Sequence, residues 1–409
     1  MLNIDWNTCS AADEKRGGCK KILIAADWVP IMDSQKTPIF DRVMSDEPEK
    51  CYGGVLDVLN RADLRIFNLE CAVNGKTPVI KSGPHLLAAD RHMPCLKAGR
   101  PDIVTLANNH VFDYGVEGYL STCRALDKLG IRHYGAGLDD REAWTPLVYD
   151  LDGVKIGLVS FTEGHDFTAA GPGKPGVAGW DVGRARSVIR DLKGKCDVVI
   201  VIPHAGIEYA AHPSVYCIDA YRELAAEKPD AIVAHHPHVP QGLEIRDGVP
   251  IFYSLGNFMF HMGTSFHYRR HGFMVELEVD RQGLHGFRIY PFFIADHGLE
   301  LLDGDGVREF GGLLHKLSRP FDGDDPYAGI NGFFKLYWHK DPLAQFRQAV
   351  DLFATDPLWA AAMIRNRTTT LQHVGLHLPM IERAISGKID DVPAWSEEME
   401  REYMTRMLK

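Results

Sequence analysis

Short, strongly apolar segments alternate with amphipathic segments along the first three quarters of this 409-residue chain, and no other feature of the sequence constrains its fold as much. Segments 20–27 (KKILIAAD), 64–69 (LRIFNL) and 197–204 (DVVIVIPH) have the length and apolar content of buried strands. Segment 117–130 (EGYLSTCRALDKLG) has helical spacing and ends at Gly130, a residue type that commonly stops helices. Strands that alternate with helices predict an α/β fold with a mixed sheet.

The rest of the chain predicts a hairpin and a helical extension. In segment 147–161 (LVYDLDGVKIGLVSF) an Asp-Gly pair separates two alternating runs, which is typical of a β-hairpin. From about residue 300 onward there are several helical stretches and no convincing strand. We therefore predict a flexible N-terminal arm (1–19), an α/β domain (20–299) and a helical C-terminal extension (300–409). Further strands are predicted at 102–108, 230–236, 249–257, 272–279 and 284–294.

Charge and composition argue against several classes of protein. The formal net charge of -10 leaves no basic footprint for nucleic acid. No apolar run is long enough for a signal peptide or a transmembrane segment, so we predict a cytoplasmic protein. The eight cysteines include no C-x-x-C pair, which predicts reduced thiols rather than a zinc ribbon or a thioredoxin-like motif. A disulfide between Cys9 and Cys19 is the alternative.

Polar side chains stand at the carboxyl ends of several predicted strands, where open α/β sheets place their ligand crevices. Carboxylates, amides and imidazoles at such positions cost desolvation energy unless they are paired or bound to an ion. Each motif alone also fits a turn, a helix cap or a surface group, so the prediction depends on their joint occurrence. Together these groups are the ligands of a divalent metal. The residues are Asp27, Asn68, Glu70, Asn109, His110, His204, His236, His238 and Asn257.

Four longer motifs are distinctive in combination: 106–137 (LANNHVFDYGVEGYLSTCRALDKLGIRHYGAG), 204–209 (HAGIEY), 234–245 (AHHPHVPQGLEI) and 248–260 (GVPIFYSLGNFMF). They resemble the CapA family, which is named for poly-γ-glutamate capsule synthesis. The resemblance runs from about residue 21 to 280 and leaves the helical extension outside it. It implies a fold similar to the calcineurin-like metallophosphoesterases, which is a sandwich of mixed β-sheets flanked by helices.

The resemblance also implies a metal centre and a role for each residue in it. His110 resembles the general acid of the related phosphoesterases. The cofactor is expected to be one or two divalent ions of manganese, iron or zinc. By position, the first metal takes Asp27 and His238, the second takes Asn109, His204 and His236, and Glu70 bridges the two.

Two departures from the phosphoesterase pattern leave another interpretation open. The third position of the first motif is a histidine in the phosphoesterases and is Val29 here, and the bridging position is Glu70 rather than an aspartate. With one ligand missing, the pocket would hold a single metal or none. A CapA-like peptide epimerase is a precedent for such a scaffold, and Asp27 and His297 would then be the catalytic pair that transfers the proton.

Three functions therefore follow from the sequence. The first is a metal-dependent hydrolase or transferase that acts on a phosphoester or amide in polymer or peptide biosynthesis. The second is a metal-independent peptide epimerase. The third is a non-catalytic component of a polymer-synthesis complex, in which the C-terminal helices would mediate assembly or homo-oligomer formation.

The expected substrate is an acidic polymer, a peptide or a phosphoester. Its anionic groups would be bound by Lys81, Arg269 and Arg270, because arginine forks suit carboxylates and phosphates. Asn257 is predicted to contribute to the same substrate site. For the three cationic residues, solvated surface charge is the alternative.

Overall fold

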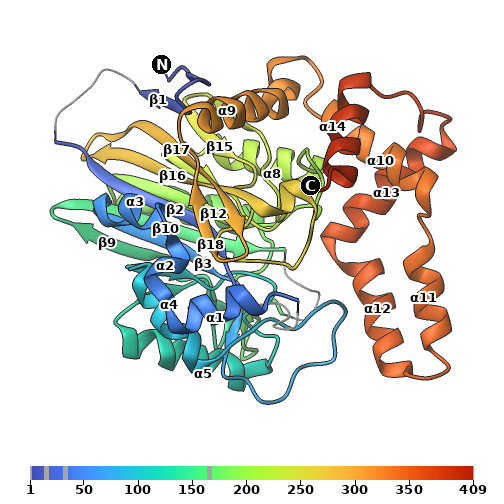
Figure 1. Ribbon diagram of the computed structural model, residues 1–409, viewed down its shortest axis with the longest axis horizontal. Helices are drawn as coiled ribbons and strands as arrows, with labels where there is room; N and C mark the ends of the chain where they lie inside the picture. Colours follow the sequence, from blue (N-terminus) through green and yellow to red (C-terminus); the bar gives the residue numbers. More distant parts are fainter. Residues whose placement is uncertain (1, 13–17, 31–35, 164–167, 409) are drawn as a thin grey trace.

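The chain forms a sandwich of two β-sheets surrounded by helices, with a separate group of helices at one side (Figure 1). This computed structural model describes residues 2–12, 18–30, 36–163 and 168–408. Both sheets are mixed, and the region after residue 303 is helical, as predicted from the sequence. The predicted fold class, an α/β sandwich with a helical C-terminal region, is therefore confirmed.

The first sheet has eight strands among the described residues, in the order β1–β17–β16–β2–β3–β6–β7, with β18 also paired to β17. Strands β2, β3, β6 and β7 are parallel, so their carboxyl ends lie at one edge of the sheet. The strands are β1 (Ser10–Ala12), β2 (Lys20–Trp28), β3 (Leu64–Leu69), β6 (Ile103–Thr105), β7 (Arg132–Tyr134), β16 (His271–Asp280), β17 (Gly283–Ala295) and β18 (Gly298–Leu301).

The second sheet has the order β14–β15–β13–β12–β10–β9. Strands β10, β12, β13 and β15 are parallel, and β9 and β10 form the predicted antiparallel hairpin. The strands are β9 (Leu147–Leu151), β10 (Val154–Thr162), β12 (Val198–His204), β13 (Ala231–Val233), β14 (Leu243–Arg246) and β15 (Val249–Phe252). Two short pairs join β4 (Ala72–Val73) to β5 (Leu87–Ala88) and β8 (Ala136–Gly137) to β11 (Gly176–Val177).

The helices divide into those that cover the sandwich and those that follow it. Helices of the sandwich are α1 (Pro38–Asp46), α2 (Pro48–Tyr52), α3 (Val55–Arg61), α4 (Met93–Ala98), α5 (Gly115–Leu129), α6 (Asp140–Ala143), α7 (Val182–Lys193) and α8 (Val215–Ala225). Later helices are α9 (Gly304–Ser318), which also packs on the sandwich core, α10 (Ala328–Lys340), α11 (Ala344–Leu352), α12 (Pro357–Thr369), α13 (Leu371–Ile385) and α14 (Ala394–Thr405). Short 3₁₀ turns are η1 (Asp90–His92), η2 (His267–Arg270) and η3 (Arg319–Asp322).

Strand β12 shows how the sequence builds the core. Successive side chains of a strand point to opposite faces of the sheet. Val198, Ile200 and Ile202 therefore join the cluster between the two sheets. Val199 and Val201 join a second cluster, on the face that α7 and α8 cover. Because both faces are buried, the strand is a continuous apolar run rather than an alternating one.

The two sheets meet at the edge where their parallel strands end. An isolated parallel bridge joins Asp27, at the end of β2, to Asn257, which follows β15. A second isolated bridge joins His204, at the end of β12, to His235, which follows β13. The backbone N–H of Phe258 also donates to the carbonyl of Asp27 at 3.2 Å. Polar residues at the ends of strands in both sheets are therefore brought to one place.

The structure corrects one sequence expectation about the N-terminal segment and decides the alternative left open for its cysteines. Part of the predicted flexible arm is a strand, because Ser10 to Ala12 pair with the edge of β17, with Ser10 opposite Arg288. The alternative disulfide between Cys9 and Cys19 is not formed, and both are free thiols. Cys9 is buried, with its Sγ 3.5 Å from the carbonyl oxygen of Val307 in α9.

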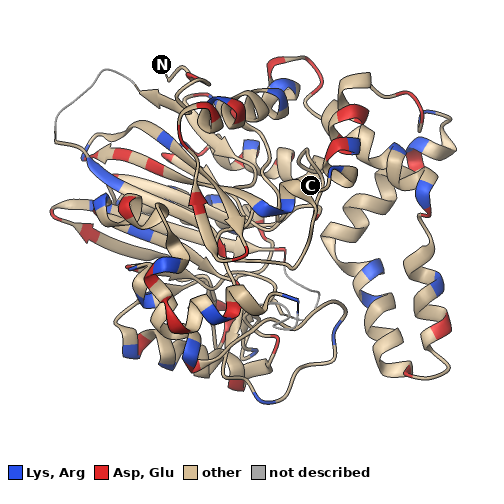
Figure 2. Ribbon diagram, viewed as in Figure 1, with Lys and Arg blue, Asp and Glu red and all other residues tan. Residues whose placement is uncertain are grey.

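Charged residues of both signs are interspersed along the helices of the sandwich and of the C-terminal region (Figure 2). Within the described part of the chain, none of the helices combines the length and apolarity needed to cross a membrane.

The C-terminal helices pack on the segment that follows β12. Ile207 and Ala210 of this segment share an apolar cluster with Ile330, Phe333 and residues of α13. The same segment is held by a carboxylate of the last helix. Glu400, which is fully buried, accepts hydrogen bonds from the backbone N–H groups of Ala211 (2.8 Å) and His212 (3.1 Å) and from the His212 ring (2.9 Å).

We expect Glu400→Ala to lower the free energy of unfolding by about 2–3 kcal/mol, because it leaves buried N–H donors without an acceptor. Urea unfolding followed by circular dichroism measures this change. The matched control is Glu398→Ala on the exposed face of the same helix, which should change stability by less than about 0.5 kcal/mol. Equal stability of the two variants would contradict the prediction.

Candidate functional site

The residues predicted to bind metal converge at the edge where the two sheets meet. Each lies at or just after the carboxyl end of a different strand, or shares a loop with another of the set. None is more than 5% exposed. Asp27 lies in β2, Glu70 follows β3, Asn109 follows β6, His204 ends β12, and His236 and His238 follow β13.

His204 lies at the centre of the cluster. Its Nε2 is 2.8 Å from Oδ1 of Asn109, 3.2 Å from Oε1 of Glu70 and 3.1 Å from Nδ1 of His236. Its Nδ1 is 3.1 Å from Nδ2 of Asn68. Burial, and then the neighbouring His236, holds the pKa of His204 well below its usual value, so the ring is neutral.

Asp27 is surrounded by nitrogen atoms. Nδ2 of Asn68 donates to its Oδ1 at 2.7 Å, and Nδ1 of His238 lies 3.4 Å from its Oδ2. Nδ1 of His235 lies 3.6 Å from Oδ1. Burial alone would raise the pKa of Asp27, but the neighbouring His235 and His238 outweigh burial and hold the pKa well below its usual value. Asp27 is therefore a carboxylate anion.

Glu70 has the opposite electrostatic setting. Burial raises its pKa well above the usual value, and the negative charge of Asp27 raises it further. Both of its carboxylate oxygens are buried and make no hydrogen bond to the described residues. A buried carboxylate without a partner is costly, so a positive charge between Glu70 and Asp27 would stabilise this arrangement.

The backbone conformation of the histidine loop is unusual for side-chain-bearing residues. His236 has φ +104° and His238 has φ +58°, both in the region that favours glycine. Such conformations cost about 1–3 kcal/mol each and are found where the surrounding structure enforces them, often at functional sites. In this loop a ring nitrogen of each histidine lies within 4.8 Å of a carboxylate oxygen of Glu70.

The residues present fit a divalent cation. Glu70, His236 and His238 each offer a ligand atom, and these atoms all lie within 4.8 Å of one another. The buried atoms that lack a hydrogen bond among the described residues include Oδ2 of Asp27, both oxygens of Glu70 and Nε2 of His236. These are acceptors or ligand atoms, and a metal ion would satisfy them together.

His110 lies beside this cluster in a triad of its own. Its Nδ1 is 2.7 Å from Oδ2 of Asp113 and 3.1 Å from Nζ of Lys81, and Lys81 also forms an ion pair with Asp113. Burial, and then the Lys81 ammonium, lowers the pKa of His110, while Asp113 opposes this. The ring is therefore neutral at pH 7, and Asp113 fixes its orientation.

The family of the chain follows from a comparison of sequences. Residues 30–262, more than half of the chain, match the model of the bacterial capsule synthesis protein PGA_cap family. The chain belongs to this family. The resemblance predicted from its motifs is therefore confirmed.

Two curated relatives match about half of this chain. The PGA biosynthesis protein CapA of Bacillus subtilis is 34% identical over 219 residues, which is 52% of this chain and 56% of that protein. The capsule biosynthesis protein CapA of Bacillus anthracis is 32% identical over 187 residues, which is 44% of this chain and 45% of that protein. The chain thus spans about half the length of these curated relatives.

Among solved structures, the 5'-nucleotidase of Candida albicans matches 76% of this chain and 56% of its own, with a TM-score of 0.40 and 13% identity.

The structure does not bring every predicted site residue of this PGA_cap family member to the cluster. His297 lies between β17 and β18, where its side chain is 68% exposed and 3.4 Å from Oε1 of Glu300. The geometry therefore does not pair His297 with Asp27.

Arg270 already donates hydrogen bonds to Asp296 (2.9 Å) and to the carbonyl of Ile294 (2.6 Å).

The other residues predicted to bind substrate are placed differently from one another. Lys81 is 1% exposed and forms an ion pair with Asp113, so it is a buried charge and not a solvated surface group. Oδ1 of Asn257 is 2.9 Å from Nδ1 of His238, so Asn257 orients a predicted metal ligand. Arg269 alone among the predicted cationic residues lines the large pocket that opens over Asn109 and His110.

Sequence analysis missed Glu163 as a site residue. Its Oε1 is 3.5 Å from Nε2 of His236, and its Oε2 accepts a hydrogen bond from the Tyr216 hydroxyl at 2.6 Å. Burial raises the pKa of Glu163 to about 8. Glu163 follows directly after β10, so the rule that identified the other residues would have found it if applied to this strand as well.

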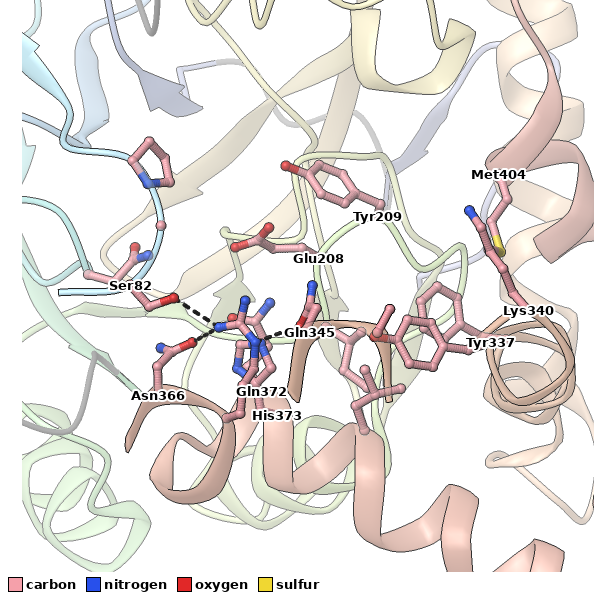
Figure 3. A pocket seen from close by; sticks show the side chains of 18 of the residues that line it. Ser82, Glu208, Tyr209, Tyr337, Lys340, Gln345, Asn366, Gln372, His373 and Met404 are labelled. Carbon is pink, nitrogen blue, oxygen red and sulfur yellow. Dashed lines mark hydrogen bonds between the residues drawn. The ribbon is translucent and has the colours of Figure 1, made fainter. Parts of the chain in front are cut away.

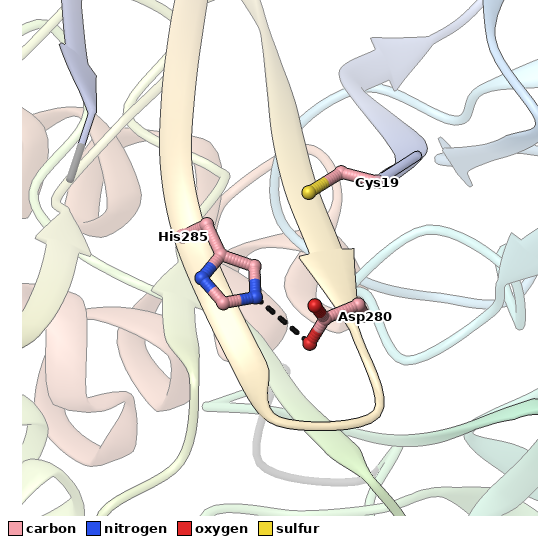
Figure 4. Close-up of side chains that lie close together, drawn as sticks. All are labelled: Cys19, Asp280 and His285. Atoms are coloured by element: carbon pink, nitrogen blue, oxygen red, sulfur yellow. Dashed lines mark ion pairs between the residues drawn. The ribbon is translucent and has the colours of Figure 1, made fainter. Parts of the chain in front are cut away.

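A second group of metal-ligand types lies away from this site, where the β16–β17 hairpin meets the N-terminal segment (Figure 4). Cys19, Asp280 and His285 offer ligand atoms within 4.8 Å of one another. Nε2 of His285 and Oδ1 of Asp280 form an ion pair at 2.8 Å, so these two groups already satisfy each other.

Proposed function

We propose that this chain is a metal-dependent hydrolase or transferase that acts on a phosphoester or amide bond of an acidic polymer, peptide or related substrate. The observation that supports this most is the pair of buried carboxylates, Asp27 and Glu70, which lie beside His238 and His204. Oδ2 of Asp27 and both oxygens of Glu70 make no hydrogen bond to the described residues. A bound divalent ion would polarise the scissile group and supply an activated water. Asp27, Glu70, Asn109, His204, His236 and His238 would hold it.

His110 is the residue we assign to proton transfer. Asp113 engages its Nδ1, so Nε2 is the atom that would exchange a proton with the substrate. Since burial and Lys81 keep the ring neutral, it would accept a proton from the attacking water and pass it to the leaving group. The carboxylate of Asp113 would stabilise the imidazolium formed between these two steps.

Metal content tests this proposal directly. We expect protein purified without chelator or a metal-affinity column to contain at least about one manganese, iron or zinc ion per chain by elemental mass spectrometry. His236→Ala should lose most of this metal, because it removes a nitrogen ligand beside Glu70. The matched control is His339→Ala, an exposed histidine of α10 that pairs with Asp390, and it should keep the full metal content.

The same measurement of metal content distinguishes the hydrolase from a second candidate function, a metal-independent epimerase. Val29, at the position where the related phosphoesterases have a histidine, is fully buried, and Nδ1 of His238 lies 3.4 Å from Oδ2 of Asp27. These two observations favour a metal-independent epimerase in which Asp27 and His238, rather than His297, move the proton. Metal-free protein, even after incubation with excess ions, would reject the hydrolase and support the epimerase.

A further inference from the structure

A pocket lies between the sandwich and the C-terminal helices. It has a volume of about 430 Å³, within the range that small ligands occupy. One side is formed by the segment around Asn109, His110 and Glu208, and the other by α10, α12 and α13. Figure 3 shows side chains from both sides, including Glu208, Gln345 and His373, around the same space. The C-terminal helices therefore form a wall of the cavity that borders the candidate active site.

Arg367 of α12 enters this pocket with neutral partners only. Its Nε donates to Oε1 of Gln345 at 2.6 Å, and its Nη1 donates to Oγ of Ser82 at 3.0 Å and to Oδ1 of Asn366. Among the described residues no carboxylate forms an ion pair with it. These hydrogen bonds hold the guanidinium in a fixed orientation between α12 and the 82–84 loop. None of its described hydrogen-bond partners is an anion.

Arg269 provides a second cationic group from the sandwich. Its guanidinium carbon lies 3.6 Å from the centre of the Tyr209 ring and 4.6 Å from that of Phe266. Its Nε is buried and makes no hydrogen bond to the described residues. Stacking on two rings orients the fork without neutralising it, which is a common setting for anion recognition by arginine.

Positive charge exceeds negative charge around the pocket. The lining contains three cationic side chains, Arg269, Lys340 and Arg367, and two carboxylates, Glu208 and Asp341. Asp341 forms an ion pair with Arg347, outside the pocket. Glu208 acts on both pocket arginines, and it also lies near His236 and His238 of the histidine loop, which lower its pKa against the effect of burial.

The remaining wall of the pocket is apolar. Phe333 and Tyr337 of α10, Leu376 of α13 and Met404 of α14 line it. Apolar surface of this kind would gain little from a bare inorganic ion, but it would bury the carbon skeleton of an organic ligand. The pocket thus combines a cationic part with an apolar part.

We propose that this pocket binds an organic anion that has an apolar portion, and that Arg367 and Arg269 hold its anionic group while the C-terminal helices cover its carbon skeleton. This rests on the proposed function, since it places the substrate's charged end beside Asn109 and His110. The anionic group is a carboxylate of a peptide-like chain or a phosphate. The C-terminal region is then part of the binding site rather than only an assembly module.

Calorimetric titration of the full chain tests this with three probes: N-acetyl-phenylalanyl-glutamate, its neutral diamide, and phenyl phosphate. We expect one of the anions to bind at least about tenfold more tightly than the diamide, and Arg367→Gln and Arg269→Gln each to weaken it about tenfold or more. The control Arg401→Gln removes an exposed arginine of α14 that pairs with Glu397 and should leave binding unchanged. Tighter binding of the peptide assigns a carboxylate, and tighter binding of phenyl phosphate assigns a phosphate.

The proposal is overturned if the diamide binds as tightly as both anions, or if both pocket variants bind as tightly as the control. Arg269→Gln keeps the test valid if Arg367→Gln does not fold. The Arg269 side chain makes no described hydrogen bond that the fold would lose. Metal content measured on the same samples separates this result from the proposed function: metal-free protein rejects the hydrolase, while the anion titration can still succeed.

Discussion

Replacement of Asp113 by alanine is expected to lower the free energy of unfolding by about 3–5 kcal/mol, the largest stability effect we expect from a single substitution in this chain. Asp113 is 1% exposed and pairs with Lys81, which is equally buried, and with His110. Its Oδ2 also accepts the backbone N–H of Leu86 at 2.7 Å. Alanine would leave the buried Lys81 ammonium without its counter-charge. The free energy needed to bury this unpaired charge is larger than the net stability that the ion pair contributes.

Urea unfolding at pH 7 measures the loss, and the double variant Asp113→Leu with Lys81→Met is its control. Because the double variant removes both charges, it should recover most of the stability lost in the single variant. If the single variant is as stable as the double variant, the buried pair does not have the assigned role.

The pH dependence of the wild-type chain gives an independent check. Burial alone would raise the pKa of Asp113, but the charges of His110 and Lys81 outweigh it and lower the pKa to about 2. A lowered pKa in the folded state stabilises the protein above the ordinary value of 3.8, and this contribution is lost as the pH falls toward 2. The stability difference between wild type and Asp113→Ala should therefore shrink over that interval.

Periodicity explains why the sheets could be predicted from the sequence. In β12, five consecutive apolar residues serve two separate clusters, so the run itself identifies a strand buried on both faces. The Asp-Gly pair likewise determined the β9–β10 hairpin. Ser10 to Ala12 could not be recognised as a strand, because three residues carry no usable period and only the exposed edge of β17 makes them extended.

The convergence of the proposed metal ligands could be predicted because these residues obey one local rule, polar residues at the ends of apolar strands, and parallel strands bring those ends together. His297 also follows a strand whose carboxyl end lies at this edge, because β17 runs in the same direction as β2. However, β16 separates β17 from β2, and His297 lies exposed in the turn to β18, so the rule does not bring it to Asp27. The placement of Arg367 depends on how α12 packs against a loop more than 280 residues earlier in the chain, and no local pattern encodes that contact.

Substitution of Glu70 by glutamine should have opposite effects in the absence and presence of metal. In chelator, we expect the melting temperature to rise by about 2 °C or more, because an unpaired buried carboxylate is replaced by a neutral amide. With excess divalent metal, the wild type should gain stability by mass action, while Glu70→Gln should gain little. Its metal affinity should fall by at least about 100-fold, since the ligand lost carries charge as well as an oxygen atom.

Differential scanning calorimetry of both proteins, with chelator and with each of manganese, iron and zinc, measures both expected effects on the melting temperature in one series. The control is Glu278→Gln on β16, a carboxylate of the same sheet that lies outside the cluster and should behave as wild type in every condition. A variant that is destabilised in chelator would mean that the Glu70 carboxylate is satisfied by protein groups alone. That outcome would remove the physical reason for a cation between Glu70 and Asp27, and with it the main support for the hydrolase.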